Sequence, residues 1–167
     1  EQGVAHTDIV PSNVLLSEHD VKLSDFGNAS VRKNKFFRRK TPRGQRFFYP
    51  PEMLREKMPG YVRFDNTADL YELAMVLVFM TTGVFPRLME LERERRAGKI
   101  SDEDLLKHYR LVKERGEVEL PDGIPQPLKE VIKKAISPYP EARYQSAEEL
   151  SLALLKVYNM TPKENAA

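Results

Sequence analysis

Residues 6–13 read His6-Thr7-Asp8-Ile9-Val10-Pro11-Ser12-Asn13, and residues 25–27 read Asp25-Phe26-Gly27. Asp8 is a carboxylate, which can orient a hydroxyl group and accept its proton. Asn13 and Asp25 carry side-chain oxygen atoms, the hard ligands that suit Mg²⁺. Two oxygen ligands that flank a carboxylate base fit a site for transferring a phosphoryl group from a magnesium–nucleotide complex.

Two short apolar runs lie between these motifs and indicate how the motifs meet. Val14–Leu16 and Val21–Leu23 are separated by the polar residues 17–20, a pattern typical of a β-hairpin. A hairpin would turn the chain back, so that Asn13 and Asp25 lie side by side. From Ser24 to Pro51 neither a helical nor a strand period holds, and loops of this length are usually functional or mobile.

The rest of the chain is predicted to be helical. One helix should begin at Asn66 or Thr67 and end at about Thr82, before Gly83. Its segment 73–80 is apolar all round, which predicts burial on every side. Capping residues and helical spacing predict four further helices: an exposed charged one over Leu88–Arg96, one that starts at Ser101 and Asp104, one through Leu128–Ile136, and one behind a capping box of Ser146 and Glu149.

The composition of the chain excludes several kinds of site and several classes of protein. The chain has 167 residues, of which 41% are hydrophobic and 31% charged, as expected of a folded domain. A net charge of +2 is too small to indicate a polyanion partner, and the absence of cysteine excludes disulfides and thiolate zinc sites. The longest apolar run, 73–80, is far shorter than the ~20 residues of a membrane span. Since no signal peptide is visible either, a cytoplasmic protein without membrane contact is expected.

The motifs together resemble those of the eukaryotic-type (Hanks-type) Ser/Thr protein kinase family, and look most like the bacterial-type members. The family set is H-R-D-L-x-x-x-N, then D-F-G, then A-P-E; here residues 6–13 and 25–27 are followed by Pro50-Pro51-Glu52. Asp69-Leu70-Tyr71 and Pro140-Glu141-Ala142-Arg143-Tyr144 resemble two later family motifs. The resemblance runs from Val4 to about Tyr158.

This resemblance implies a mainly α fold, the C-terminal lobe of a kinase domain, in which a short β-hairpin carries the catalytic and metal loops. Residues 1–160 would form this partial domain and 161–167 a disordered tail. The implied function is ATP-dependent phosphoryl transfer to Ser or Thr of a protein substrate, with ATP and Mg²⁺ as cofactors. Asp8 would be the catalytic carboxylate, and Asn13 and Asp25 would hold the metal and nucleotide.

Other residues acquire structural roles by the same resemblance. His6 would pack against Phe26, which would lie beneath the site next to Gly27. Asp69 would accept hydrogen bonds from the backbone of the catalytic loop. Arg143 would form an ion pair with Glu52. Ser30 and Thr41 are candidate phosphorylation sites in the activation segment, residues 25–52.

The chain departs from the family pattern at several points. It contains no Gly-rich loop, strand lysine or helix glutamate for the upper half of the ATP site, so this chain alone is expected to be inactive. Thr7 stands for the family Arg, Val10 for a Lys, and Gln45, after Gly44, for a Thr. Two functions therefore remain open: an active kinase in a complete form, or a pseudokinase or isolated lobe that binds a partner protein.

A basic cluster raises a third alternative. Eight Lys and Arg residues lie within residues 32–46 without an acidic residue, and aromatic residues flank them. Such a composition can bind nucleic acid. The simpler interpretation is a solvated activation segment, so nucleic acid is not expected as a partner, and an acidic substrate or partner protein is the next alternative.

Overall fold

A computed structural model describes residues 4–31, 47–54, 66–83 and 86–160. The basic cluster with Thr41, Gly44 and Gln45, and the expected disordered tail at 161–167, lie outside the described residues. Within the described ranges no helix is both long enough and apolar enough to cross a membrane.

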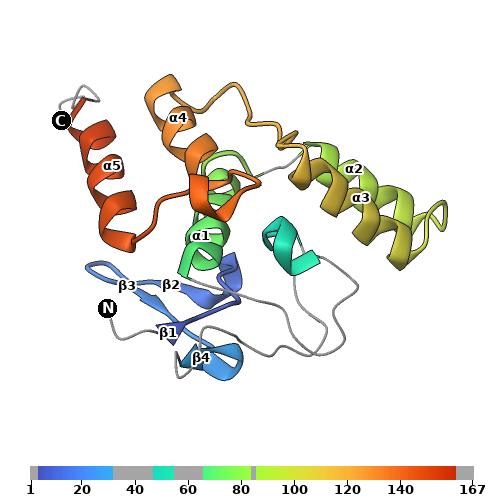
Figure 1. Ribbon diagram of the computed structural model, residues 1–167, viewed down its shortest axis with the longest axis horizontal. Coiled ribbons are helices and arrows are strands. Elements are labelled where there is room, and N and C mark those ends of the chain that lie inside the picture. The colour runs from blue at the N-terminus through green and yellow to red at the C-terminus, as the bar shows by residue number, and fades with distance from the viewer. Residues whose placement is uncertain (1–3, 32–46, 55–65, 84–85, 161–167) are drawn as a thin grey trace.

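The described part of the chain is mainly α, as predicted for a kinase-like lobe. Figure 1 shows the helices forming the body of the molecule, with the short strands gathered at one end of it. The helices are α1 Asn66–Thr82, α2 Pro86–Arg96, α3 Asp102–Glu114, α4 Gln126–Ala135 and α5 Ala147–Met160. Short 3₁₀ helices span Pro11–Asn13, Phe26–Asn28, Pro51–Leu54 and Pro140–Ala142.

Two antiparallel strand pairs bring the N-terminal motifs together. Strands β2 (Val14–Leu16) and β3 (Val21–Leu23) form the predicted hairpin, with Val14 opposite Leu23. The structure adds a pair that the sequence did not reveal, β1 (Val4–Ala5) with β4 (Ser30–Val31). Strands of two residues are too short to show an alternating pattern. The outer pair ties the chain before the first motif to the chain after the second.

Helix α1 is the centre of the core and has the predicted bounds. Ala68, Tyr71 and Met75 are among its fully buried side chains, and Gly83 follows with a φ of +69°, the left-handed conformation that favours glycine after a helix. The prediction of burial on every side through 73–80 is wrong at its end: Phe79 and Met80 are 37% and 54% exposed. The core therefore covers α1 only as far as Val78.

Helices α2 and α3 pack against each other on one side of α1 (Figure 1). The side chain of Ser101 accepts a hydrogen bond from the Asp104 N–H, so the predicted helix start is confirmed. Leu105 and Tyr109 on α3 are buried. The charged helix α2 is expected to be exposed, but it has one buried apolar side chain, because Leu91 is only 1% exposed.

Helices α4 and α5 pack together, and α4 also packs on α1. The predicted apolar face of α4 is buried through Val131, Ile132 and Ala135. At the start of α5 the Ser146 hydroxyl accepts from the Glu149 N–H, but the Glu149 carboxylate reaches the N–H of Gln145 instead of closing the capping box on Ser146.

An ion pair joins the segment before α5 to the segment before α1. The Arg143 guanidinium donates from its two terminal nitrogens to the two carboxylate oxygens of Glu52, at 2.7 and 2.8 Å, as predicted. Its Nε donates to the carbonyl of Ser137 at 2.8 Å, and its Cζ lies 4.9 Å from the centre of the Tyr71 ring. The Arg143 side chain is fully buried, and among the described residues the Glu52 carboxylate is the anion paired with it.

We expect Glu52→Gln to lower the free energy of unfolding by about 3–5 kcal/mol, because it leaves the guanidinium buried without an anion. Urea unfolding would measure the change. Glu103→Gln is the matched control, since Glu103 pairs with Lys107 at 2.9 Å on the exposed face of α3, where ion pairs contribute little. Equal effects of the two substitutions would contradict the structural role of Glu52.

A buried lysine fixes α3 to the chain that precedes Pro50. The Lys113 amine donates to the carbonyl of Phe47 at 2.7 Å and to the carbonyl of Tyr49. The residue is 0% exposed. Burial lowers the pKa of Lys113 to about 7, although the carboxylates of Glu72 and Glu52 act in the opposite direction.

This pKa makes the stability of the fold depend on pH in a defined direction. Between pH ~7 and ~10 the folded state has released the Lys113 proton while the unfolded chain still binds it, so the free energy of unfolding rises with pH. We expect the stability of the wild type relative to Lys113→Met to increase from about pH 6.5 to about pH 9, as measured by urea unfolding. Lys107→Met, an exposed change on the same helix, should show no such trend. If the difference in free energy of unfolding between wild type and Lys113→Met does not change with pH, the lowered pKa of Lys113 is refuted.

Candidate functional site

The first motif is a loop whose backbone is held by two acidic residues of α1. Asp69 accepts hydrogen bonds from the N–H groups of His6 and Thr7, at 2.7 and 2.8 Å. Glu72, one turn further along α1, accepts from the N–H of Ile9 at 2.7 Å. Hydrogen bonds to ionised carboxylates are among the stronger ones in proteins. The contact predicted for Asp69 is confirmed, and Glu72 adds a second anchor that the sequence analysis missed.

Thr7 lies in an unfavourable backbone conformation inside this loop. Its φ is +61°, which is rare for a β-branched residue and marks a strained position. The hydroxyl of Thr7 donates to the carbonyl of Asn28 at 2.9 Å, so the loop is also bonded to the chain after Asp25-Phe26-Gly27. A short neutral side chain therefore joins the two motifs at the position where the family has an arginine.

The Asp8 carboxylate is bonded on both of its oxygens. The Tyr49 hydroxyl donates to Oδ1 at 3.0 Å, and the Asn28 amide donates to Oδ2 at 3.1 Å. The Asn13 amide donates to the Asp8 backbone carbonyl at 3.0 Å. Asp8 is 9% exposed, and Val10 beside it is buried. Two segments distant in sequence, those of Asn28 and Tyr49, thus contact this carboxylate and restrict its orientation.

The second motif forms a tight turn that presents Asp25 to solvent. Asp25 has a φ of +62°, and its Oδ1 accepts from the N–H of Gly27 at 3.3 Å. A Cβ at Gly27 would lie 3.1 Å from the same oxygen, so a larger residue there would press on the carboxylate. The His6 ring contacts the Phe26 ring edge-on at 4.7 Å between centroids, as predicted, but Phe26 is 55% exposed.

Backbone contacts at the base of the β2–β3 hairpin bring the two candidate metal ligands close in space. The N–H of Ser24 donates to the Asn13 carbonyl at 2.9 Å, and the Ser24 hydroxyl contacts the same oxygen at 3.2 Å. Asp25 therefore directly follows a residue bonded to Asn13. Within the described ranges no three His, Cys, Asp or Glu residues cluster as a metal site. Asn13 and Asp25 fit an ion that takes its remaining ligands from phosphate and water.

The sequence contains weak signals for two of the buried residues that the analysis of motifs missed, Glu72 and Lys113. Glu72 is a charge in an apolar stretch of α1, three residues after Asp69. Lys113 lies on the buried face of α3, at i+4 and i+8 from Tyr109 and Leu105. A charged residue on an otherwise apolar face indicates a buried partner. Tyr49 and Asn28 had no comparable signal. Thr41 and Gln45 lie outside the described residues, and Ser30 pairs through its backbone in β4.

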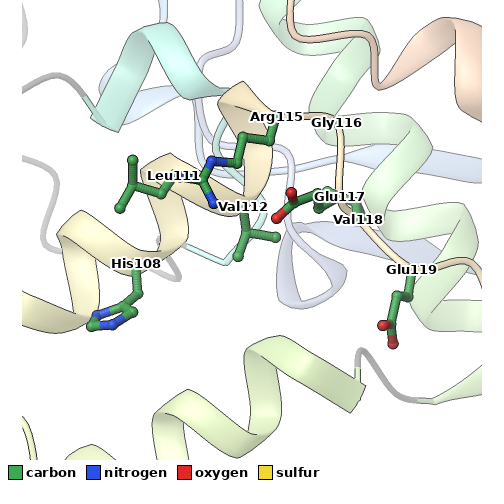
Figure 2. A pocket seen from close by; sticks show the side chains of 8 residues that line it. All are labelled: His108, Leu111, Val112, Arg115, Gly116, Glu117, Val118 and Glu119. Atoms are coloured by element: carbon green, nitrogen blue, oxygen red, sulfur yellow. The ribbon is translucent and has the colours of Figure 1, made fainter.

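A cavity of about 570 Å³ lies elsewhere, at the C-terminal end of α3 and the segment after it. Figure 2 shows the side chains that line it, in which one guanidinium and two carboxylates are mixed with apolar groups. This composition favours no ligand class. The lining residues are His108, Leu111, Val112, Arg115, Gly116, Glu117, Val118 and Glu119.

Comparison with known proteins agrees with this geometry. The family model described as protein kinase domain matches residues 1–153. The chain is 29% identical to the CBL-interacting serine/threonine-protein kinase 20 of Arabidopsis thaliana over 85% of this chain and 29% of the relative. It is 28% identical to a probable serine/threonine-protein kinase of Clostridium perfringens over 94% of this chain and 21% of the relative.

A third similar protein is the serine/threonine-protein kinase grp of Drosophila melanogaster, with 36% identity over 52% of this chain and 16% of the relative. The chain thus spans less than a third of the length of each of these three relatives. Since the family model covers far more than half of the chain, and the loop geometry agrees with it, the chain belongs to the protein kinase domain family.

Proposed function

We propose that this chain acts as the C-terminal lobe of a kinase that transfers the γ-phosphoryl group of ATP to Ser or Thr of a protein substrate. The lobe would comprise residues 1–160, with 161–167 as a tail. The observation that carries the proposal is the convergence at Asp8, whose loop is anchored to α1 and lies beside Asn13 and the base of the hairpin that leads to Asp25. The match to the protein kinase domain family supports the same reaction.

In this proposal Asp8 orients the substrate hydroxyl and accepts its proton while the hydroxyl oxygen attacks phosphorus and the bond to ADP breaks. When bound, ATP would supply the phosphoryl group, and Mg²⁺ would neutralise charge on its phosphates. Asn13 and Asp25 contribute oxygen ligands for the metal. Tyr49 and Asn28 keep the carboxylate in one orientation, which favours attack in line with the leaving group. The strained, twice-anchored loop serves the same purpose.

The catalytic role of Asp8 is testable in a protein that contains both lobes, because the family also binds phosphate through a Gly-rich loop and a strand lysine. We expect Asp8→Asn to lower transfer of labelled phosphate from ATP to Ser/Thr peptides by about 10²-fold or more. Asp20→Asn, an equivalent change in the exposed β2–β3 turn, should leave transfer unchanged. Undiminished transfer by Asp8→Asn would refute the role of Asp8, and no transfer by the wild type would favour the partner-binding alternative.

The metal role of Asp25 has a readout that does not require turnover. We expect Asp25→Asn to raise the Mg²⁺ concentration needed for half-maximal ATP binding by roughly tenfold or more, since even indirect partners of a metal alter affinity by about 10–100-fold. Calorimetric titration of ATP at several Mg²⁺ concentrations would measure this. Asp122→Asn, at an exposed site between α3 and α4, is the control, and an unchanged Mg²⁺ requirement in Asp25→Asn would show that Asp25 does not hold the metal.

A further inference from the structure

A chain of polar contacts leads from the buried side of α3 to the Asp8 carboxylate. The Lys113 amine donates to the backbone carbonyls of Phe47 and Tyr49, and the Tyr49 hydroxyl donates to Asp8 Oδ1. Lys113 and Tyr49 are both 0% exposed. One residue, Tyr49, is therefore bonded to α3 through its backbone and to the candidate catalytic loop through its side chain.

We propose that Lys113 is a positioning residue for Asp8 and that it acts through Tyr49. By holding the backbone of residues 47–49, the lysine keeps the Tyr49 hydroxyl on the carboxylate. The contact between Lys113 and Tyr49 stands on the structure alone, whereas its consequence for phosphoryl transfer rests on the proposed function. Helix α3, through Lys113, thus contributes to the position of the Asp8 carboxylate.

The rigidity of tyrosine makes this coupling effective. A tyrosine side chain has only two torsion angles, so a fixed backbone and a packed ring leave the hydroxyl one place to lie. The ring of Tyr49 is enclosed in the core. A shift of the backbone at Tyr49 would therefore move the hydroxyl relative to Asp8, and small displacements of a positioned group are costly in catalysis.

Tyr49 is one of the described residues that hold the Asp8 carboxylate. Kinases of the resembling type carry a lysine two residues after the aspartate, but here that residue is Val10, which is buried and apolar. Among the described residues, Tyr49 and Asn28 donate hydrogen bonds to the Asp8 carboxylate. Hydrogen bonds weaken steeply when their geometry departs from the preferred distance and angle, so the contact between Tyr49 and Asp8 depends on the support of Tyr49 from α3.

Charged groups from three other elements face the Lys113 amine. Glu72 comes from α1, Glu52 from the 3₁₀ helix Pro51–Leu54, and Arg143 follows the 3₁₀ helix Pro140–Ala142. Glu72 also accepts from the N–H of Ile9. The lysine and the catalytic loop thus share an electrostatic partner. Because the pKa of Lys113 is about 7, the proton on the amine changes occupancy near neutral pH.

A double-mutant cycle separates positioning from a purely structural role. In the two-lobe protein we expect Lys113→Met and Tyr49→Phe each to lower kcat by roughly 10–100-fold while KM for ATP stays unchanged. The double variant should be no slower than the slower single variant, because both changes remove the same contact. Lys107→Met, on the exposed face of α3, should keep wild-type kcat. Multiplicative losses in the double variant would overturn the proposal.

A second measurement needs neither activity nor a substitution of the buried lysine. In this chain, labelled with ¹³C and ¹⁵N, the Lys113 amine and the Asp8 carboxyl carbon are followed by NMR between about pH 6 and pH 8.5. We expect the Asp8 signal to shift with the midpoint of Lys113, and this component to disappear in Tyr49→Phe. An Asp8 shift that persists in Tyr49→Phe, or an Asp8 signal that does not follow the Lys113 midpoint, would refute the coupling of Lys113 to Asp8 through Tyr49.

The two experiments distinguish a failure of the positioning role of Lys113 from a failure of the proposed function. If the NMR signals are coupled but the two-lobe protein transfers no phosphate, the positioning role of Lys113 stands and the proposed kinase activity is refuted. If phosphate is transferred, but the double variant shows multiplicative losses and the Lys113 and Asp8 signals are uncoupled, the kinase activity stands and the positioning role of Lys113 is refuted.

Discussion

The contact between the start of α1 and the backbone of the first loop is the constraint on which the rest of the site depends. Asp69 takes two successive N–H groups, those of His6 and Thr7, and thereby stabilises a backbone with a positive φ at Thr7. Without these acceptors the N–H groups would be buried and unsatisfied, which is costly in a core. Because α1 is also the centre of the apolar core, the orientation of Asp8 follows from the packing of the whole body.

Two buried cations connect the outer parts of the molecule to this centre. Arg143 joins the segment before α5 to Glu52, and Lys113 joins α3 to the residues just before Glu52. Both lie near the Tyr71 ring of α1. Residues 47–54 are therefore held from two sides by charged groups that bond to specific atoms, and general apolar contact alone would not define their position as closely.

The sequence predicted those features that depend on local pattern or on a complete motif. The β2–β3 hairpin, the bounds of α1, the start of α3 and the Arg143–Glu52 pair are confirmed. The β1–β4 pair was missed because two residues show no period. The exposed end of α1 was missed because apolarity does not reveal where the surrounding core ends. The partners of Asp8, Tyr49 and Asn28, depend on tertiary contacts between distant segments, which no local pattern records.

The burial of Lys113 also has a consequence for how the fold opens. The Lys113 amine bonds two backbone carbonyls in the core. If α3 opens to water, those carbonyls lose their partner as well. Local unfolding occurs in cooperative units that share such contacts. Helix α3 and residues 47–49 should accordingly belong to one unit, so that a peripheral helix and the neighbourhood of Asp8 gain or lose order together.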